Sequence, residues 1–250
     1  MVTDTLKLFN APIVEAIIDI DCFMPLEPNL ISLEASIRES LGNKYPTTRP
    51  IHFQGIHVEA LDGVEPIIRK SQGLQGYQVV DSAEKQIVQF RVQGFSFNRL
   101  SPYSSLDDYL LEIERTWSIF VKIAKPIQVK QIRLRYINKL ILPMGSENIE
   151  LDTYLSFGPK LPDDQQLAML GFLYQYSAVE VATQNRANVV IAAQPIEGDN
   201  LPVIFDIGVQ TDAPFDPSDW QAISKAIQSL RLLKNSIFKK TLTNTCLDLF

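Results

Sequence analysis

Apolar and polar residues alternate over residues 14–22, where every even position is apolar and positions 15, 19 and 21 are acidic. This two-residue period predicts a β-strand with one apolar face and one mostly polar face. After Pro28 the apolar spacing changes to three or four residues, which predicts a helix from about residue 29 that ends at Gly42. The apolar positions of this helix are Leu30, Leu33, Ile37 and Leu41.

The rest of the first half favours more strands and a second helix. Strand-like patterns cover residues 51–60, 76–80 and 86–97, with turn sequences between them. Ser105 begins the next helix, because a serine hydroxyl can accept a hydrogen bond from a free amide at a helix start. An apolar stripe at helical spacing follows over residues 106–121, and Pro126 closes it.

The second half repeats this order of elements. It predicts a strand at 129–142, a short helix near 163–170 and three strands at 173–182, 188–194 and 202–211. Asp216 is then expected to cap the last helix, with Pro217 at its first position. An apolar stripe from Trp220 to Leu233 marks that helix.

Each half therefore reads β-α-β-β-β-α, with an offset of roughly 110 residues. The expected fold class is α+β. Two pseudo-repeated halves, residues 1–125 and 126–250, are expected to pack as one compact body. They would form a bent antiparallel sheet with one face covered by long helices and the other face open or paired with a partner.

Composition narrows the classes of partner. The chain has 250 residues, of which 46% are hydrophobic and 21% charged, as in an ordinary globular protein. A net charge of −6 makes nucleic acid an unexpected partner, because such binding relies on Lys and Arg at phosphates. The two cysteines lack Cys-x-x-Cys spacing, and the sequence contains neither a signal-peptide pattern nor a long apolar run. We therefore expect a cytoplasmic protein that does not contact membranes.

Familiar catalytic motifs are missing from the sequence. It contains neither the lysine-bearing phosphate loop, nor the glycine-rich dinucleotide turn, nor the serine elbow of hydrolases. The two histidines, His52 and His57, lie five residues apart in an expected strand and so point to opposite faces. We therefore expect no cofactor and lean towards a protein that is not an enzyme.

The strongest acidic group is Glu15, Asp19 and Asp21, which share one face of the first strand. Three carboxylates there could hold Mg²⁺ for phosphoryl chemistry, which makes a metal-dependent phosphotransferase or nuclease one alternative. The other interpretation is a solvated sheet face on which these carboxylates pair with arginines of neighbouring strands.

Basic residues accompany the carboxylates. Arg133 and Arg135 share a strand face and could grip a phosphate or carboxylate, while Tyr103 could anchor a partner or cap the core. The leading hypothesis is non-enzymatic recognition of a protein partner or small ligand through a polar sheet face. Single-stranded RNA binding and a homodimer through this face stay open. The candidate binding residues are Glu15, Asp19, Arg91, Tyr103, Arg133 and Arg135.

Three motifs and the last helix carry a family resemblance. The motifs are APIVEAIIDI at 11–20, FNRLSPY at 97–103 and LRYIN at 134–138, and the helix contains Phe238 and Thr241. Together they resemble a sporadically distributed, uncharacterised family of bacterial and archaeal proteins over essentially the whole chain. The sequence departs from the family by having Gln131 and Arg133 ahead of LRYIN. The family has no assigned activity, and its patchy distribution implies a link to defence or toxin–antitoxin loci.

Overall fold

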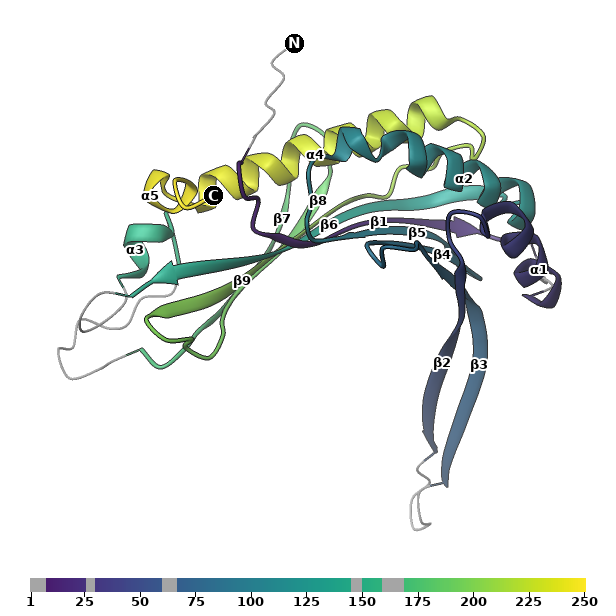
Figure 1. Ribbon diagram of the computed structural model, residues 1–250, viewed down its shortest axis with the longest axis horizontal. Helices are drawn as coiled ribbons and strands as arrows, with labels where there is room; N and C mark the ends of the chain where they lie inside the picture. The colour runs from purple at the N-terminus through teal and green to yellow at the C-terminus, as the bar shows by residue number, and fades with distance from the viewer. Residues whose placement is uncertain (1–7, 26–29, 60–66, 145–149, 159–168) are drawn as a thin grey trace.

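The computed structural model describes residues 8–25, 30–59, 67–144, 150–158 and 169–250. In these residues nine strands form one antiparallel open sheet in the order β2-β3-β4-β5-β1-β6-β9-β8-β7 (Figure 1). The strands are β1 (Ile13–Phe23), β2 (Thr47–Glu59), β3 (Ile67–Val80), β4 (Gln86–Arg91), β5 (Gly94–Leu100), β6 (Gln128–Pro143), β7 (Leu173–Val179), β8 (Arg186–Ala193) and β9 (Asn200–Thr211).

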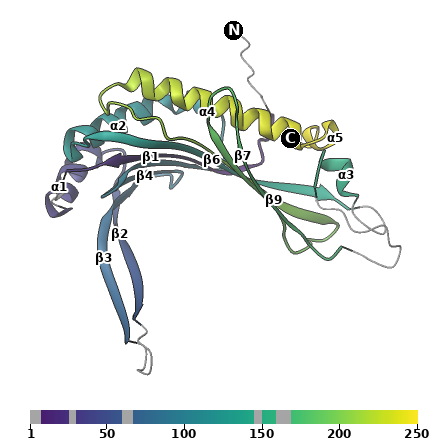
Figure 2. The same cartoon turned by 180° about the vertical axis from the view of Figure 1, so that it is seen from behind.

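Helices connect the strands and follow them. They are α1 (Leu30–Leu41), α2 (Leu110–Ala124), α3 (Leu151–Tyr154), α4 (Trp220–Thr241) and α5 (Asn244–Leu247), with a short 3-10 turn at Leu106–Asp108. Figures 1 and 2 show α2 and α4 on the same side of the sheet and α1 at one end of the molecule. The hairpin of β2 and β3 runs away from the sheet on the opposite side (Figure 1). The fold is thus mixed, with an antiparallel sheet at its centre.

The two central strands, β1 and β6, show why the sheet has an apolar side. Ala16, Ile18 and Ile20 of β1 are buried, as the alternation predicts, and β6 buries Ile132 and Leu134 in the same way. The two strands pair with each other, so these side chains form one apolar surface. Burying them stabilises the fold by about 25 cal/mol per Å² of apolar surface removed from water.

An aromatic cluster packs α2 against the sheet. Phe95 of β5 lies edge-on to Trp117 with the ring centroids 5.6 Å apart, and Phe120 stacks on Trp117 at 5.3 Å. The indole nitrogen of Trp117 donates a hydrogen bond to the carbonyl oxygen of Pro217 at 3.0 Å. This bond ties α2 to the segment that leads into α4.

The strand expected at 86–97 is in fact two strands. The chain turns at Val92 and Gln93, and Gly94 begins β5 with a φ of 149°. The first half therefore has four strands between its helices, where the pattern predicted three. The turn was missed because neither of its central residues is a typical turn former.

Two expected caps also differ. Asp219, and not Asp216, caps α4, because its carboxylate accepts a hydrogen bond from the amide of Ala222 at 2.9 Å. Asp216 instead accepts from the amide of Ser218 at 2.8 Å, in the turn before the helix. Ser105 caps the 3-10 turn that precedes α2. The helix expected near 163–170 lies almost wholly outside the described residues.

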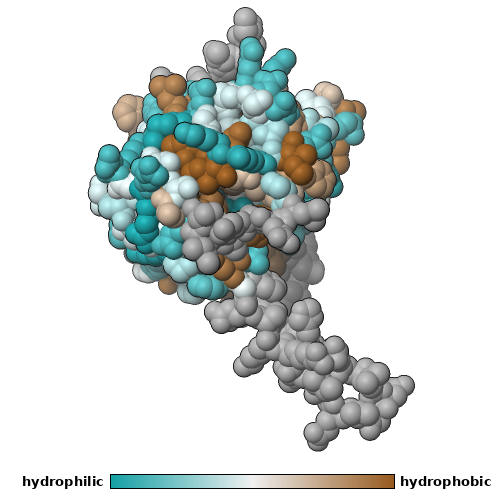
Figure 3. Space-filling view, turned by 90° about the vertical axis from the view of Figure 1, so that its right-hand side faces the viewer, coloured by the Kyte–Doolittle hydropathy of each residue, from teal (hydrophilic) through white to brown (hydrophobic). Residues whose placement is uncertain are grey.

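The surface at the α1 end of the molecule mixes apolar and polar side chains. Figure 3 shows several small apolar groups separated by polar side chains on this face. Leu111 and Ile127 are among the exposed apolar residues of the described chain. Scattered exposed apolar residues of this kind are normal for a globular protein. Of the helices in the described ranges, none has the length and apolar character needed to cross a membrane.

Candidate functional site

The open face of the sheet carries paired charges. Asp19 Oδ1 accepts from Arg91 at 2.9 Å, and Asp21 lies 3.4 Å from the same guanidinium. Arg133 approaches Asp21 at 3.4 Å and Asp19 at 3.7 Å. The period of two puts the carboxylates on this face, and the register places Arg133 directly opposite Asp19. The two carboxylates thus already have cationic partners.

The remaining candidates on this face also have partners. Arg135 pairs with Asp206, with its closest contact at 2.6 Å, and Glu15 accepts a hydrogen bond from Asn98 at 2.8 Å. Among the described residues, no group of three or more His, Cys, Asp or Glu side chains is arranged so that it could hold a metal ion. The buried Nε of Arg91 has no hydrogen-bond partner in the described part of the chain.

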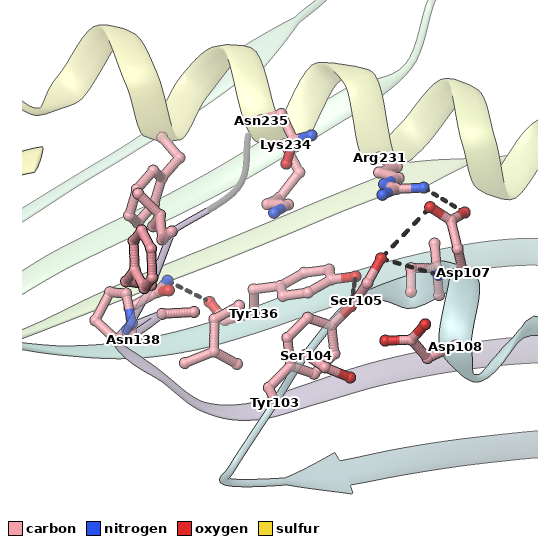
Figure 4. A pocket seen from close by; sticks show the side chains of 17 residues that line it. Tyr103, Ser104, Ser105, Asp107, Asp108, Tyr136, Asn138, Arg231, Lys234 and Asn235 are labelled. Carbon is pink, nitrogen blue, oxygen red and sulfur yellow. Dashed lines mark hydrogen bonds and ion pairs between the residues drawn. The ribbon is translucent and has the colours of Figure 1, made fainter. Parts of the chain in front are cut away.

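Tyr103 lies elsewhere, on the helix side of the sheet. It lines a pocket of about 600 Å³ between α4, the segment 103–108 and the segment 8–13 (Figure 4). Tyr136 and Asn138 of β6 also line it. The structure therefore separates Tyr103 from the five other residues that the sequence analysis grouped with it.

Strand β6 supplies polar groups to this pocket because its apolar face is interrupted. Tyr136 and Asn138 take two inward positions between the buried Leu134 and Leu140. The amide nitrogen of Asn138 donates to the carbonyl oxygen of Phe205 at 2.8 Å, which fixes the side chain. A buried amide needs such a bond to offset the loss of water.

Two tyrosines meet at one side of the pocket. The hydroxyl groups of Tyr103 and Tyr136 are 3.1 Å apart, and their rings are edge to face with centroids 5.7 Å apart. Burial raises the pKa of both phenols, so both stay protonated at neutral pH. Each can therefore act as a hydrogen-bond donor.

Lys234 reaches this pocket from α4. It is 8% exposed, and its Nζ lies 4.1 Å from the centroid of the Tyr136 ring. Burial, together with the neighbouring Arg231 guanidinium, lowers the pKa of Lys234 to about 7. The ring face attracts the ammonium form and works in the opposite direction.

The other cation of the pocket already has a partner. Arg231 Nη1 lies 2.7 Å from Asp107 Oδ1, and the bond from Arg231 lowers the pKa of that carboxyl. Throughout the ranges that the structure describes, Lys234 has neither a hydrogen-bond nor an ion-pair partner. Its recorded neighbour is the Tyr136 ring. An ammonium ion that is buried without a counter-charge is costly and therefore uncommon.

Comparison with known proteins gives no relative: no protein-family model matches the chain, and no curated protein matches it.

The motifs of the sequence nevertheless come together in space. Each of the three motifs, and the last helix, contributes residues to the wall of this pocket. These residues are Pro12 and Ile13, Tyr103, Tyr136 and Asn138, and Phe238.

Sequence reasoning missed Lys234, although a signal was present. The positions of α4 that face the sheet follow a spacing of three or four residues through Ile227, Leu230 and Phe238. Lys234 occupies the position between Leu230 and Phe238 in that series, where an apolar residue is expected. A lysine inside an apolar stripe is the pattern that points to this pocket.

Proposed function

We propose that the protein is a recognition protein that binds a small anionic ligand in the pocket between α4 and the sheet. The observation that carries this proposal is the buried Lys234 ammonium without a counter-charge. A carboxylate or phosphate group on a ligand would supply that missing charge. Charge-assisted hydrogen bonds of this kind are roughly twice as strong as neutral ones.

The pocket limits the size and charge of such a ligand. Its volume of about 600 Å³ falls in the range of sites that hold small molecules. Asp107 and Asp108 are exposed on the segment 103–108, where they would repel a polyanion. We therefore expect a ligand with one or two negative charges and a body that packs against the tyrosines.

The first test uses pH. Tartrate keeps both of its charges between about pH 6 and pH 8.5, whereas Lys234, with a pKa of about 7, loses its proton over this range. Protonated Lys234 binds the anion, so the affinity should fall by about thirtyfold as the pH rises over this range. Isothermal titration calorimetry in an anion-free buffer measures this change.

Binding of tartrate through surface arginines would not depend on pH in this range, because arginine stays charged. Equal affinities at the two pH values would therefore contradict the proposal. Replacing the exposed Lys225 of the same helix with glutamine is the matched control, and it should leave both affinities unchanged.

A second candidate function is recognition of a protein partner through the open sheet face. The side chains of Arg133 and Arg135 remain 41% and 53% exposed despite their ion pairs, so a partner could reach them. Such exposed pairs contribute little to stability, typically below 1 kcal/mol. None of the observations on the described residues favours the metal-dependent or RNA-binding alternatives.

The change Arg135→Ala separates this candidate from the first. It should abolish retention of the partner and leave the melting temperature nearly unchanged. Native mass spectrometry of the tagged protein isolated from its own host compares the variant with the original chain. Lys139 lies on the same strand as Arg135 and forms an exposed ion pair with Glu197, so Lys139→Ala is the control. A partner that the Arg135→Ala protein still retains would contradict this candidate.

We also propose that the two halves of the chain are pseudo-repeats. Outward from the centre, the order β1-β5-β4-β3 matches the order β6-β9-β8-β7, and β2 is the extra strand. Helices α2 and α4 then follow the matching strands β5 and β9. We likewise propose that the chain is related to the sporadically distributed family, that it is cytoplasmic and that it is linked to defence loci.

A further inference from the structure

The Lys234 amine has the surroundings of a nucleophile. Figure 4 shows its side chain descending from α4 towards Tyr136 in the pocket. The groups beside it are the Arg231 guanidinium, which is already bonded to Asp107, and the face of the Tyr136 ring. A lysine that is desolvated and lies beside another cation becomes a nucleophile for carbonyl groups.

We propose, on the basis of the ligand-binding pocket described above, that Lys234 forms an imine with the carbonyl group of a small 2-oxo acid. Arg231 precedes Lys234 by three residues, so the two side chains leave the same face of α4 about one helical turn apart. Asp107 and Gln228 both contact Nη1 of Arg231, and Nη2 can donate to the ligand carboxylate. A carboxylate bonded directly to a carbonyl carbon matches this pair of groups.

The step is balanced without any oxidant or reductant. The lone pair on Nζ attacks the carbonyl carbon and a C–N bond forms while the C=O π bond breaks. One of the two protons on the nitrogen moves to the former carbonyl oxygen, which gives a neutral carbinolamine. The C–O bond then breaks, the hydroxyl group leaves with a proton from solvent as water, and a protonated imine remains. The exposed Asp108 carboxylate at the pocket wall can relay that proton.

Burial of the amine also favours the reaction at neutral pH. With a pKa of about 7, roughly three-quarters of Lys234 is neutral near pH 7.5, whereas about one exposed lysine in a thousand is neutral there. The Tyr136 ring favours the cation, and Lys234 also lines the pocket, from which a ligand can approach its amine. Lys234 should therefore react before any exposed lysine of the chain.

The experiment traps the imine. The full chain is incubated with pyruvate and sodium cyanoborohydride near pH 7.5, and peptide mass spectrometry locates the carboxyethyl groups. We expect the rate at Lys234 to exceed the rate at the exposed Lys225 of the same helix by at least tenfold. Lactate, which has the same carboxylate but no carbonyl, should slow trapping at Lys234 and leave Lys225 unaffected. Because both lysines are compared within one molecule, the result does not depend on the folding of a variant.

The outcomes separate this inference from the proposed function. Equal trapping at Lys234 and Lys225 would overturn the imine, and pH-dependent tartrate binding would still support the anionic site. A preference for Lys234 that lactate does not reduce would also overturn it, because the ligand carboxylate would then not be bound. Loss of both the preference and the tartrate binding would remove the pocket function as well. In the variant Lys234→Arg, which keeps the cation, the carboxyethyl group at this position should disappear while tartrate still binds.

Discussion

Replacing Lys234 with methionine is expected to raise the free energy of unfolding near pH 7 by about 2–4 kcal/mol and to abolish tartrate binding. Burial lowers the pKa of this lysine from 10.5 to about 7, which corresponds to at most about 5 kcal/mol. The lost contact with the Tyr136 ring offsets part of the gain. Methionine has a flexible apolar chain that fits the buried stripe of α4.

The stability difference should depend on pH with a defined sign. The folded-state pKa of Lys234 lies below the unfolded value, so the unfolded chain binds more protons between about pH 7 and pH 10. The destabilisation of the folded state by Lys234 is therefore fully present below pH 7. It disappears as the pH rises towards the pKa of this lysine in the unfolded chain. In urea denaturation at several pH values, the free energy of unfolding of the original chain should approach that of the methionine variant as the pH rises.

The change Lys225→Met on the exposed side of α4 is the control, and it should alter the free energy of unfolding by less than about 0.5 kcal/mol. A Lys234→Met protein that is less stable than the original chain would mean that the ammonium is compensated. That result would remove the main reason for placing an anion in the pocket.

Replacing Gly94 with alanine is expected to lower the free energy of unfolding by about 3–5 kcal/mol or to prevent folding. The φ of Gly94 is 149°, and a Cβ at this position would lie 2.1 Å from the carbonyl oxygen of Ile20 in the neighbouring strand. The obstacle is backbone, so it cannot move aside as a side chain could. Chemical denaturation measures the loss.

Gly171 provides the matched comparison for this substitution. A Cβ there would meet no atom within 4 Å, and Gly171→Ala should change the stability by less than about 0.5 kcal/mol. If the Gly94→Ala protein were as stable as the Gly171→Ala protein, the close pairing of β5 with β1 at this point would be wrong.

Gly94 also lies in the part of the fold that the sequence pattern did not predict. The central strands β1 and β6 and the long helix α4 were predicted, because burial of one face imposes a period on the sequence. The division of residues 86–97 into two strands was missed. Val92 and Gln93 have no turn preference, and the close approach that requires Gly94 involves β1, which is distant in the sequence.

The contacts of the candidate site residues were likewise predicted only in part. The period of two correctly placed Asp19 and Asp21 on one face, and the expected pairing with Arg91 and Arg133 is confirmed. Arg135, by contrast, pairs with Asp206, which is 71 residues away in the chain. The local pattern does not indicate which distant residue will lie beside this arginine. Pairing across strands depends on which strands become neighbours.

The pocket was not predicted because its parts come from four separate segments of the chain. Tyr103 was identified as a possible anchor, but its contact with Tyr136 exists only after β5, β1 and β6 assemble. Lys234 was not identified, because the apolar stripe predicted for α4 followed Trp220, Ile223, Ile227, Leu230 and Leu233. Its burial follows from the packing of α4 against the sheet.

Titration of the lysine side chains by nuclear magnetic resonance tests the central claim most directly. With ¹³C-labelled lysines, the Lys234 signal, assigned from its loss in Lys234→Met, should have a midpoint near pH 7 in the free protein. Tartrate should raise that midpoint, since an anion stabilises the ammonium form. A Lys234 midpoint close to the value of about 10.4 for free lysine, or one that tartrate does not move, would contradict an anion-binding site at this residue.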